Sequence, residues 1–214
     1  MRLHNPLDTI LNNEIKVKLL RFLCKTGGEW SGRRLAQEIK ASPAACHKAL
    51  SDLQKERILK FKSSGRSYLY SLDEDNLIIK NLLKPLYKKE EGIPAMLANI
   101  TTQLPSSVKE RVVSSAIFGS ISRKKERPDS DVDLCVIVKE KGDKKILEEH
   151  LEKINAKLMK QYGNILSPYI QTEQEFRSKF KRGLPLLRNL IRDHTLITGK
   201  PLTSILHASK KDQE

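Results

Sequence analysis

The sequence predicts an α+β protein made of two domains. Its first third shows three helical patterns followed by two alternating strand patterns, and its second half alternates strand patterns with amphipathic helices, which predicts a mixed sheet covered by helices. At 214 residues the chain also exceeds the commonest length of a single domain. We therefore expect one domain at residues 1–74, a helical connector at 75–108 and a second domain at 109–214.

Three helices are predicted in the first domain, over residues 15–24, 31–39 and 42–57. The last of these has a favoured start, because Ser42 is suited to the N-cap and Pro43 to the first helical position. Only Lys40 and Ala41 separate it from the helix before, so the connection has the length of a helix-turn-helix.

The third predicted helix has two different faces. Cys46, Leu50 and Leu53 recur at helical spacing and predict a buried seam. The opposite face is small and polar, which allows close approach to a groove and hydrogen bonds to bases or phosphates. That face consists of Ala44, His47, Lys48, Ser51 and Lys55.

A β-hairpin is predicted over 59–72, with its turn at Ser63–Gly65. Lys60, Lys62 and Arg66 lie near its tip, and the hairpin sequence contains no acid. Residues 1–72 hold 14 Lys and Arg against 6 Asp and Glu, so they carry +8 of the chain's net charge of +14. This balance favours an anionic partner.

Three helices followed by a basic hairpin resemble the winged helix-turn-helix of bacterial and archaeal transcription regulators. The resemblance rests on the pattern Ser42-Pro-x-x-Cys-x-x-x-Leu-x-x-Leu53, then Ile58 and the hairpin, or wing. It implies double-stranded DNA as the partner, with the third helix in the major groove and the wing on the backbone or minor groove. The residues expected to contact DNA are Arg33, Arg34, Ser42, Ala44, His47, Lys48, Lys60, Lys62 and Arg66. The alternatives are a small helical domain whose cations are only solvated, His47 then being an ordinary exposed residue, or a domain that binds protein.

The connector is predicted to form helices over 75–89 and 93–104, broken at Glu90–Gly92 and stopped by Pro105. Its apolar side chains are Leu77, Ile78, Leu82, Leu83 and Leu86. Because exposed apolar stripes are uncommon on monomers, we expect this surface to pack on a partner, and we predict a homodimer.

Phe118–Val138 contains the candidate chemistry of the second domain. Gly119–Ser120 follows a short apolar run, where backbone N–H groups can meet a polyphosphate without a Cβ in between. Asp131 and Asp133 stand at the start of an apolar strand pattern, and side chains at i and i+2 of a strand point to the same face. Two converging carboxylates suit Mg²⁺, which prefers oxygen ligands and accompanies nucleoside triphosphates.

These residues resemble the signature of the minimal nucleotidyltransferases in the DNA polymerase β superfamily. The resemblance implies transfer of a nucleoside monophosphate from a nucleoside triphosphate (NTP), with Asp131 and Asp133 as catalytic residues that hold Mg²⁺. The implied nucleotide-binding residues are Gly119, Ser120, Arg123 and Ser130. Lys124 stands where many relatives have Gly. The alternative is an ordinary turn and cap, but Asp133 lies inside an apolar strand pattern, where a carboxylate usually has a partner.

The third carboxylate of active relatives is not evident. The next predicted strand, within 164–171, offers Ser167, Tyr169 and Gln171 on one face and no acid. Glu173 and Glu175 follow it, but Thr172 with Glu175 is typical of a capping box at a helix start. Loss of a general base would slow transfer by a factor of roughly 10² to 10⁴.

The remaining elements are predicted to complete the second domain. They are a long helix over 143–162 ended by Gly163, a strand over 167–171, and two helices within 172–199. They are expected to cover the sheet with apolar faces.

The cysteines and the absence of export signals predict a cytoplasmic protein. Cys24, Cys46 and Cys135 are odd in number and lie in apolar patterns, so we expect reduced core residues, with no disulfide and no zinc site. The sequence shows no apolar stretch that could span a bilayer and no secretory leader.

Two functions remain open at this point. One is a DNA-binding transcriptional regulator whose second domain binds Mg-NTP. The other is a nucleotidyltransferase that modifies a protein such as a toxin-like partner, an RNA or a small molecule, with the first domain as a docking module. The sequence does not identify the acceptor, the preferred NTP or the DNA target.

Overall fold

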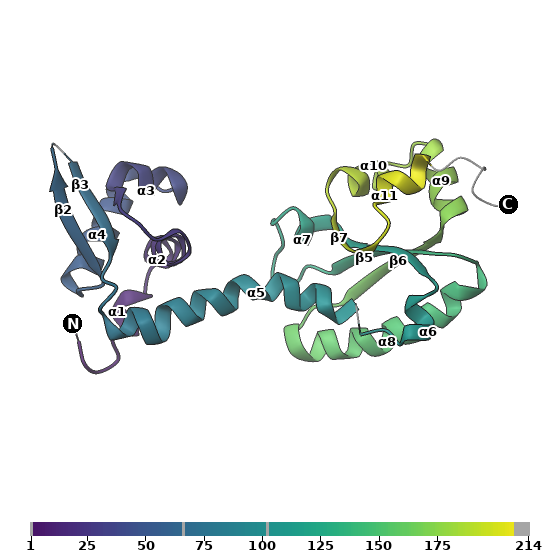
Figure 1. Cartoon of the computed structure of the whole chain (residues 1–214), viewed down its shortest axis with the longest axis horizontal. Helices are drawn as coiled ribbons and strands as arrows, with labels where there is room; N and C mark the ends of the chain where they lie inside the picture. The colour runs from purple at the N-terminus through teal and green to yellow at the C-terminus, as the bar shows by residue number, and fades with distance from the viewer. Residues whose placement is uncertain (1, 66, 102, 208–214) are drawn as a thin grey trace. The chain divides into compact units, whose positions relative to one another are not determined.

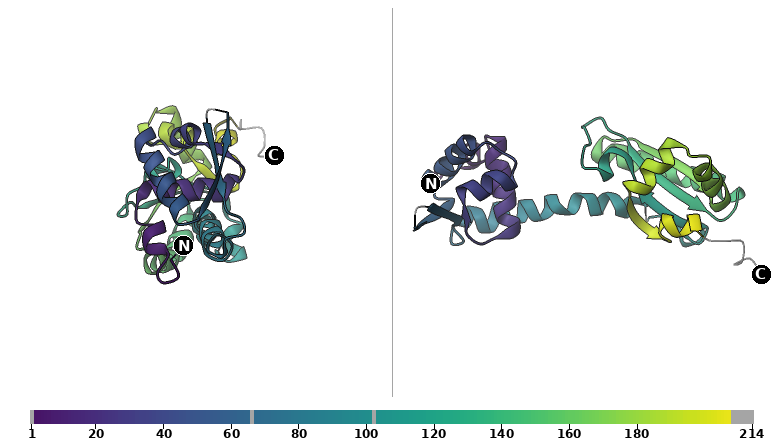
Figure 2. Two further views of the ribbon diagram at one scale, coloured as in Figure 1. Left: turned by 90° about the vertical axis from the view of Figure 1, so that its left-hand side faces the viewer. Right: turned by 90° about the horizontal axis from the view of Figure 1, so that it is seen from above.

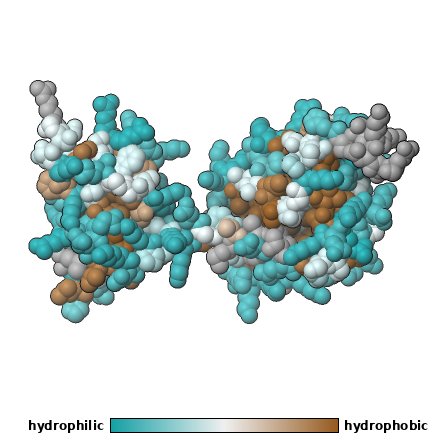
Figure 3. Space-filling model, in the orientation of Figure 1, coloured by the Kyte–Doolittle hydropathy of each residue, from teal (hydrophilic) through white to brown (hydrophobic). Residues whose placement is uncertain are grey.

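The computed structural model describes residues 2–65, 67–101 and 103–207. The chain divides into two compact units, Met1–Ile93 and Pro94–Glu214, each with its own hydrophobic core. The boundary falls inside the predicted connector. In the view of Figure 3 both units show a mainly hydrophilic surface with smaller apolar areas.

Unit 1 is built from short helices and a three-stranded sheet of order β1-β3-β2 (Figures 1 and 2). Its elements are α1 (Leu7–Ile10), α2 (Glu14–Thr26), β1 (Trp30–Ser31), α3 (Gly32–Glu38), α4 (Pro43–Lys55), β2 (Leu59–Ser64) and β3 (Ser67–Leu72). Helices α2, α3 and α4 are followed by an antiparallel hairpin, which is the order of a winged helix-turn-helix fold.

The predicted helix starts are confirmed by their caps. Ser31 Oγ accepts a hydrogen bond from the Arg34 N–H at 3.3 Å, and Ser42 Oγ accepts one from the Ala45 N–H at 3.2 Å. Cys46, Leu50 and Leu53 of α4 are buried in the core of unit 1, as their spacing predicts.

The predicted position of the hairpin turn was wrong. Ser63 and Ser64 are strand residues that pair with Tyr68 and Ser67, so β2 ends at Ser64 and the strands are joined after it. Gly65 has a φ of +57°, a left-handed conformation that glycine adopts without steric cost. Arg66 lies outside the described residues.

The predicted helix break at 90–92 was also wrong. A π-helical turn, η1 (Ile79–Leu83), leads into one helix, α5 (Lys84–Thr101), which continues through Gly92. Ile79, Leu83 and Tyr87 are buried in the core of unit 1. The apolar surface of the connector is therefore partly used to complete the N-terminal core, although Leu82 and Leu86 stay about half exposed.

Unit 2 is a mixed four-stranded sheet of order β6-β5-β4-β7, in which β5 and β6 are parallel and the other pairs antiparallel. Its elements are α6 (Ser106–Lys109), β4 (Val112–Ile117), α7 (Gly119–Ser122), β5 (Val132–Val138), α8 (Gly142–Tyr162), β6 (Leu166–Thr172), α9 (Glu173–Lys181), α10 (Pro185–Arg192), β7 (Thr195–Gly199) and α11 (Leu202–His207). The predicted mixed sheet and the long helix ended by Gly163 are confirmed.

Helices cover both faces of this sheet. Figures 1 and 2 show α8 on one side and α9, α10 and α11 on the other. Strand β7 and helix α11 were missed by the sequence analysis, which gave residues 172–199 as two helices. The residues of β7 are mostly exposed and lack a clear alternation, so no strand pattern marks them. Within the described part of the chain, no helix is long and apolar enough to cross a membrane.

Candidate active site and nucleic-acid interface

The active-site candidate begins where β4 meets α7. Phe118 is extended and its N–H donates to the Asp133 carbonyl at 3.0 Å, which ties the end of β4 to β5. Gly119 then has a φ of +76°, and a Cβ placed on it would come within 1.9 Å of Asp133 Oδ2. Only glycine fits this position, because its conformation is left-handed and a carboxylate occupies the space of a side chain.

Asp133 is a residue of β5, and Asp131 directly precedes that strand. Val132 and Leu134 face the core under α8, whereas Asp133 follows the opposite face of β5 with Cys135. Burial raises the pKa of the Asp133 carboxyl above its usual value, the negative charge of Asp131 raises it further, and the positive charge of Arg123 opposes both effects. Across the described ranges, no Lys, Arg or His forms an ion pair with either aspartate.

This donor set fits a magnesium ion. Asp131 and Asp133 offer carboxylate oxygens from one strand end, and a divalent cation there would relieve the repulsion between them. The carboxylates could hold the ion on the protein side, and it would keep positions for phosphate oxygens.

The loop after α7 is shaped by its backbone. Lys124 has a φ of +55°, and the N–H groups of Lys124 and Lys125 donate to the carbonyls of Ile121 and Ser120, both at 3.0 Å. A left-handed lysine costs about 1–2 kcal/mol relative to a right-handed one, a cost that glycine would not carry. Arg123 is exposed beside the loop.

Ser130 is engaged in the turn that leads into β5. Its Oγ accepts a hydrogen bond from the Arg127 N–H at 2.8 Å, and its own N–H donates to the Arg127 carbonyl at 3.0 Å. Its predicted contact with a nucleotide stays a prediction, as do those of Gly119, Ser120 and Arg123.

No third carboxylate joins the pair in the described residues. The parallel register of β5 and β6 places Ser167 beside Asp133 and Tyr169 beside Cys135. Glu175 closes the predicted capping box with Thr172 and forms an ion pair with Lys144, while Glu173 pairs with Arg177 at 2.6 Å. The described part of the chain contains no group of three or more His, Cys, Asp and Glu placed to hold a metal ion.

The start of β7 also borders the site. Ser122 Oγ lies 3.3 Å from Thr195 Oγ1, and Thr195 pairs with Ile117 at the end of β4. Sequence reasoning missed this neighbour because Thr195 is 73 residues from Ser122 and carries no motif.

The nucleic-acid interface candidate is the exposed face of α4. Ala44, His47 and Lys48 are exposed on it, and Ser42 is exposed at its start while its hydroxyl caps the helix. Lys48 and the exposed Arg33 of α3 form no ion pair within residues 2–65, 67–101 and 103–207. They are therefore available to phosphates.

The other described cations of this surface have acidic neighbours. Lys62 pairs with Glu29 at 2.5 Å, Lys60 with Asp73 at 2.7 Å, and Arg34 with Glu38 at 2.7 Å. The hairpin contains no acid in sequence, but the fold brings acids to it from outside. Exposed ion pairs contribute only about 0–1 kcal/mol, so these cations can exchange their partners for phosphates at small cost.

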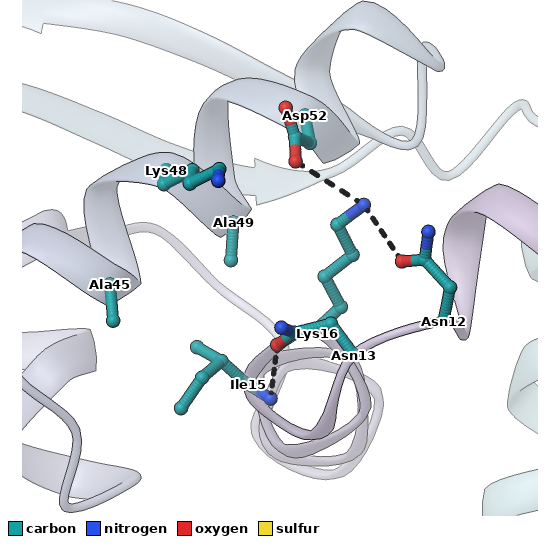
Figure 4. A pocket seen from close by; sticks show the side chains of 8 residues that line it. All are labelled: Asn12, Asn13, Ile15, Lys16, Ala45, Lys48, Ala49 and Asp52. Carbon is teal, nitrogen blue, oxygen red and sulfur yellow. Dashed lines mark hydrogen bonds and ion pairs between the residues drawn. The ribbon is translucent and has the colours of Figure 1, made fainter.

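A cavity of about 260 Å³ lies between the start of α2 and α4 (Figure 4). Lys48 lines it beside Lys16, whose Nζ is buried and contacts Thr9 O at 2.9 Å, Asn12 Oδ1 at 3.1 Å and Asp52 Oδ2 at 3.4 Å. Lys16 thus joins α1, α2 and α4, and its charge is satisfied within the unit.

Comparisons with known proteins agree with the geometry of unit 2. Residues 99–197 match the family model described as nucleotidyltransferase domain. This part of the chain is similar to that family. The match includes the Gly119 turn, Asp131, Asp133 and the whole of β4, β5 and β6. It supports nucleotidyl transfer as the general chemistry of the domain, without specifying a nucleotide or acceptor.

Solved structures with some likeness include bacterial regulators. Reduced HlyU from Vibrio cholerae N16961 has 19% identity and a TM-score of 0.35, over 39% of this chain and 84% of that protein. The antimony-specific transcriptional repressor AntR has 22% identity and a TM-score of 0.36, over 42% and 78%. A mutant of ZitR from Lactococcus lactis has 22% identity and a TM-score of 0.36, over 46% and 66%. No curated protein matches the sequence.

Proposed function

We propose that the protein is a DNA-binding transcriptional regulator whose nucleotidyltransferase domain binds a magnesium–NTP complex. One observation carries the nucleotide part of this proposal. Gly119 leaves no room for a side chain against the Asp133 carboxylate, so the turn lies directly against one of the two proposed metal ligands. A phosphate at the turn would lie next to a cation held by the carboxylates.

Each residue of the site has a distinct proposed role. Asp131 and Asp133 hold the metal, and Arg123 neutralises charge on the nucleotide. The Gly119–Ser120 turn brings backbone N–H groups close to the phosphates. Bound Mg²⁺ supplies charge neutralisation of the polyphosphate.

The DNA part rests on the winged-helix fold and on free cations beside α4. Lys48 and Arg33 are proposed to contact phosphates on either side of the groove, and His47 and Ala44 to approach base edges. DNA binding should then weaken as salt rises, because cations compete for the phosphates.

Calorimetry tests the nucleotide part. Titration with ATP, GTP, CTP and UTP is expected to give Mg²⁺-dependent heat for at least one of them with the wild-type chain. The double variant Asp131→Asn with Asp133→Asn keeps the shape of the site but removes both charges, and no heat is expected from it. Absence of Mg²⁺-dependent binding to the wild type would reject the nucleotide site.

Fluorescence anisotropy tests the DNA part. Labelled fragments of the protein's own promoter are compared with random duplexes of the same length at two salt concentrations. We expect tighter binding to at least one promoter fragment at both concentrations. Equal affinity for every duplex would reject a regulator of specific sites.

Nucleotidyl transfer is the second candidate function, because the glycine turn occurs together with the two carboxylates proposed to hold a metal. With Ser167 beside Asp133 in place of an acid, the general base would have to come from the acceptor or from water. We expect slow labelling of a protein, RNA or small molecule from radioactive NTP. No transfer to the chain itself, to lysate protein or to RNA would reject it.

We also propose a homodimer formed through the exposed side of η1 and α5. Leu82, Leu86 and Ile93 are 46%, 47% and 47% exposed and recur at helical spacing, while Ile79, Leu83 and Tyr87 point into unit 1. A second copy could cover this stripe. Sedimentation at micromolar concentration is expected to give twice the chain mass, and a monomer mass would reject the dimer.

A further inference from the structure

The wing carries an exposed aromatic pair. The register of the hairpin puts Phe61 opposite Tyr70 and Ser63 opposite Tyr68, so these side chains share one face. Tyr70 is 8% exposed and belongs to the core, whereas Phe61 is 47% exposed and Tyr68 is 56% exposed. The rings of Phe61 and Tyr68 meet edge to face at 5.5 Å, and those of Phe61 and Tyr70 lie 6.5 Å apart.

These rings form a row that starts in the core and reaches toward the tip of the wing. Phe61 is braced by Tyr70, and Tyr68 is braced by Phe61, which limits their rotamers before any partner binds. Ser63, which shares this face with them, is an exposed hydroxyl donor. The accessible chemistry on this face of the wing is therefore aromatic and hydroxylic.

The described lysines of the wing do not share this face. Lys60 and Lys62 alternate with Phe61 along β2 and are paired with Asp73 and Glu29. The two faces of the hairpin thus differ, one with neutralised cations and the other with two uncovered rings. An electrostatic contact with a partner would not explain why Phe61 and Tyr68 are exposed on the other face.

We propose that Phe61 and Tyr68 form a wedge that inserts at a base step in the minor groove of duplex DNA. The inference rests on the proposed DNA binding by unit 1 and adds a stacking contact to it. Apolar wedges between base steps partly unstack the bases, and a ring that replaces a neighbouring base recovers part of the lost stacking.

Charge and size favour a nucleic acid over a protein as the partner. Residues 1–93 hold 18 Lys and Arg against 11 Asp and Glu, so the unit attracts a polyanion. A stable protein interface covers about 800 Å² on each side, which two rings cannot supply. A ring stacked on a base accounts for roughly 5- to 150-fold in affinity, so two rings suffice for a measurable contact.

Anisotropy with a fluorescein-labelled duplex tests the wedge on the full-length chain. We expect Phe61→Ala with Tyr68→Ala to weaken binding at least tenfold while leaving the slope of affinity against salt unchanged, because phosphate contacts are kept. Tyr68→Phe is expected to bind as the wild type does. Leu3→Ala, which changes a residue 83% exposed outside the wing, is the matched control and should have no effect.

A second readout separates the wedge from a folding defect. Duplexes with 2-aminopurine at successive positions should show increased fluorescence at one step with wild type and with Tyr68→Phe, and none with the double alanine variant. Circular dichroism melts of both variants should stay close to that of the wild type, because neither Phe61 nor Tyr68 belongs to the core of unit 1.

The failure of this proposal is distinguishable from the failure of DNA binding. Wild-type affinity of the double alanine variant, together with weakened binding by Lys48→Ala, would overturn the wedge and leave DNA binding in place. No duplex binding by the wild type in low salt would overturn both. A double variant that binds duplex normally but loses self-association would overturn the wedge in favour of a protein contact.

Discussion

Several charged groups at the two candidate sites differ in whether they have a partner of opposite charge. In unit 1, Lys60, Lys62 and Arg34 each lie within ion-pair distance of an acid. In unit 2, Asp131 and Asp133 lie together at one strand end and form no ion pair within the described chain. The cations of unit 1 are thus partly neutralised before a partner arrives, whereas the carboxylates of unit 2 repel each other.

This difference predicts how much the stability of each unit changes when its site is mutated or binds a partner. Exposed ion pairs contribute about 0–1 kcal/mol, so exchanging them for phosphates changes stability little. Two adjacent carboxylates, one of them partly buried, disfavour the folded state until a cation or a proton joins them. The nucleotide site should therefore respond more strongly to mutation than the DNA surface.

The largest effect is expected from Gly119→Ala. The new Cβ would lie 1.9 Å from Asp133 Oδ2 at a φ of +76°. We expect loss of Mg-NTP binding and a decrease of roughly 1–3 kcal/mol or more in the free energy of unfolding, measured by calorimetry and urea denaturation. Gly142→Ala is the control, because no atom lies within 4 Å of its added Cβ and alanine favours helix α8. If Gly119→Ala bound Mg-NTP as tightly as the wild type, the proposed nucleotide site at the Gly119 turn would be contradicted.

The next largest effect is expected from Asp133→Asn, which should weaken Mg-NTP binding but stabilise the fold. The pKa of Asp133 in the folded chain is raised above its usual value, chiefly by burial, so the ionised carboxylate opposes folding at neutral pH. The variant should abolish Mg-NTP binding and raise the Tm at pH 7 by roughly 2–4 °C.

The pH dependence of this variant provides its control. Once the wild-type carboxyl is protonated, the charge no longer opposes folding, so the difference in Tm should shrink as the pH falls toward about 4. Wild-type Mg-NTP affinity should fall over the same acidic range, because the metal requires the ionised form. A Tm difference independent of pH would exclude this electrostatic cause.

A moderate effect is expected from Lys48→Ala in unit 1. This lysine has no ion pair in the described structure, so it loses its full phosphate contact when truncated. We expect roughly tenfold weaker DNA binding and a salt slope reduced by about 1, measured by anisotropy over a salt series. An unchanged slope would remove Lys48 from the interface.

The smallest effect is expected from Lys62→Ala. Because Lys62 must first leave Glu29, its net contribution to DNA binding should be less than about threefold. Glu29→Gln frees the lysine and is expected to strengthen DNA binding by a similar factor in the same assay. If Lys62→Ala weakened binding as much as Lys48→Ala, the distinction between paired and free cations would fail.

Much of the local structure could be predicted from the sequence. Ser42 followed by Pro43 predicted the start of α4, and the Thr172–Glu175 capping box predicted the start of α9. The Gly119–Ser120 turn between a strand and a helical turn was also predictable, because it follows a short apolar run.

Other features depended on residues distant in the sequence. Glu29 approaches Lys62 from 33 positions away, Thr195 reaches Ser122 from 73, and Glu90 holds Arg21 from 69. The helix α5 is unbroken at 90–92, where Glu90 and Glu91 pair with Arg21 and Lys25 of α2.

The sequence by itself determined the helix starts, the strand faces and the glycine turn, because short-range sterics and hydrogen bonds decide them. Only the tertiary structure decided which cations have acidic partners, that Ser167 lies beside Asp133, and that two rings of the wing stay uncovered. The physical reason is that charge pairing and burial depend on which chain segments pack together.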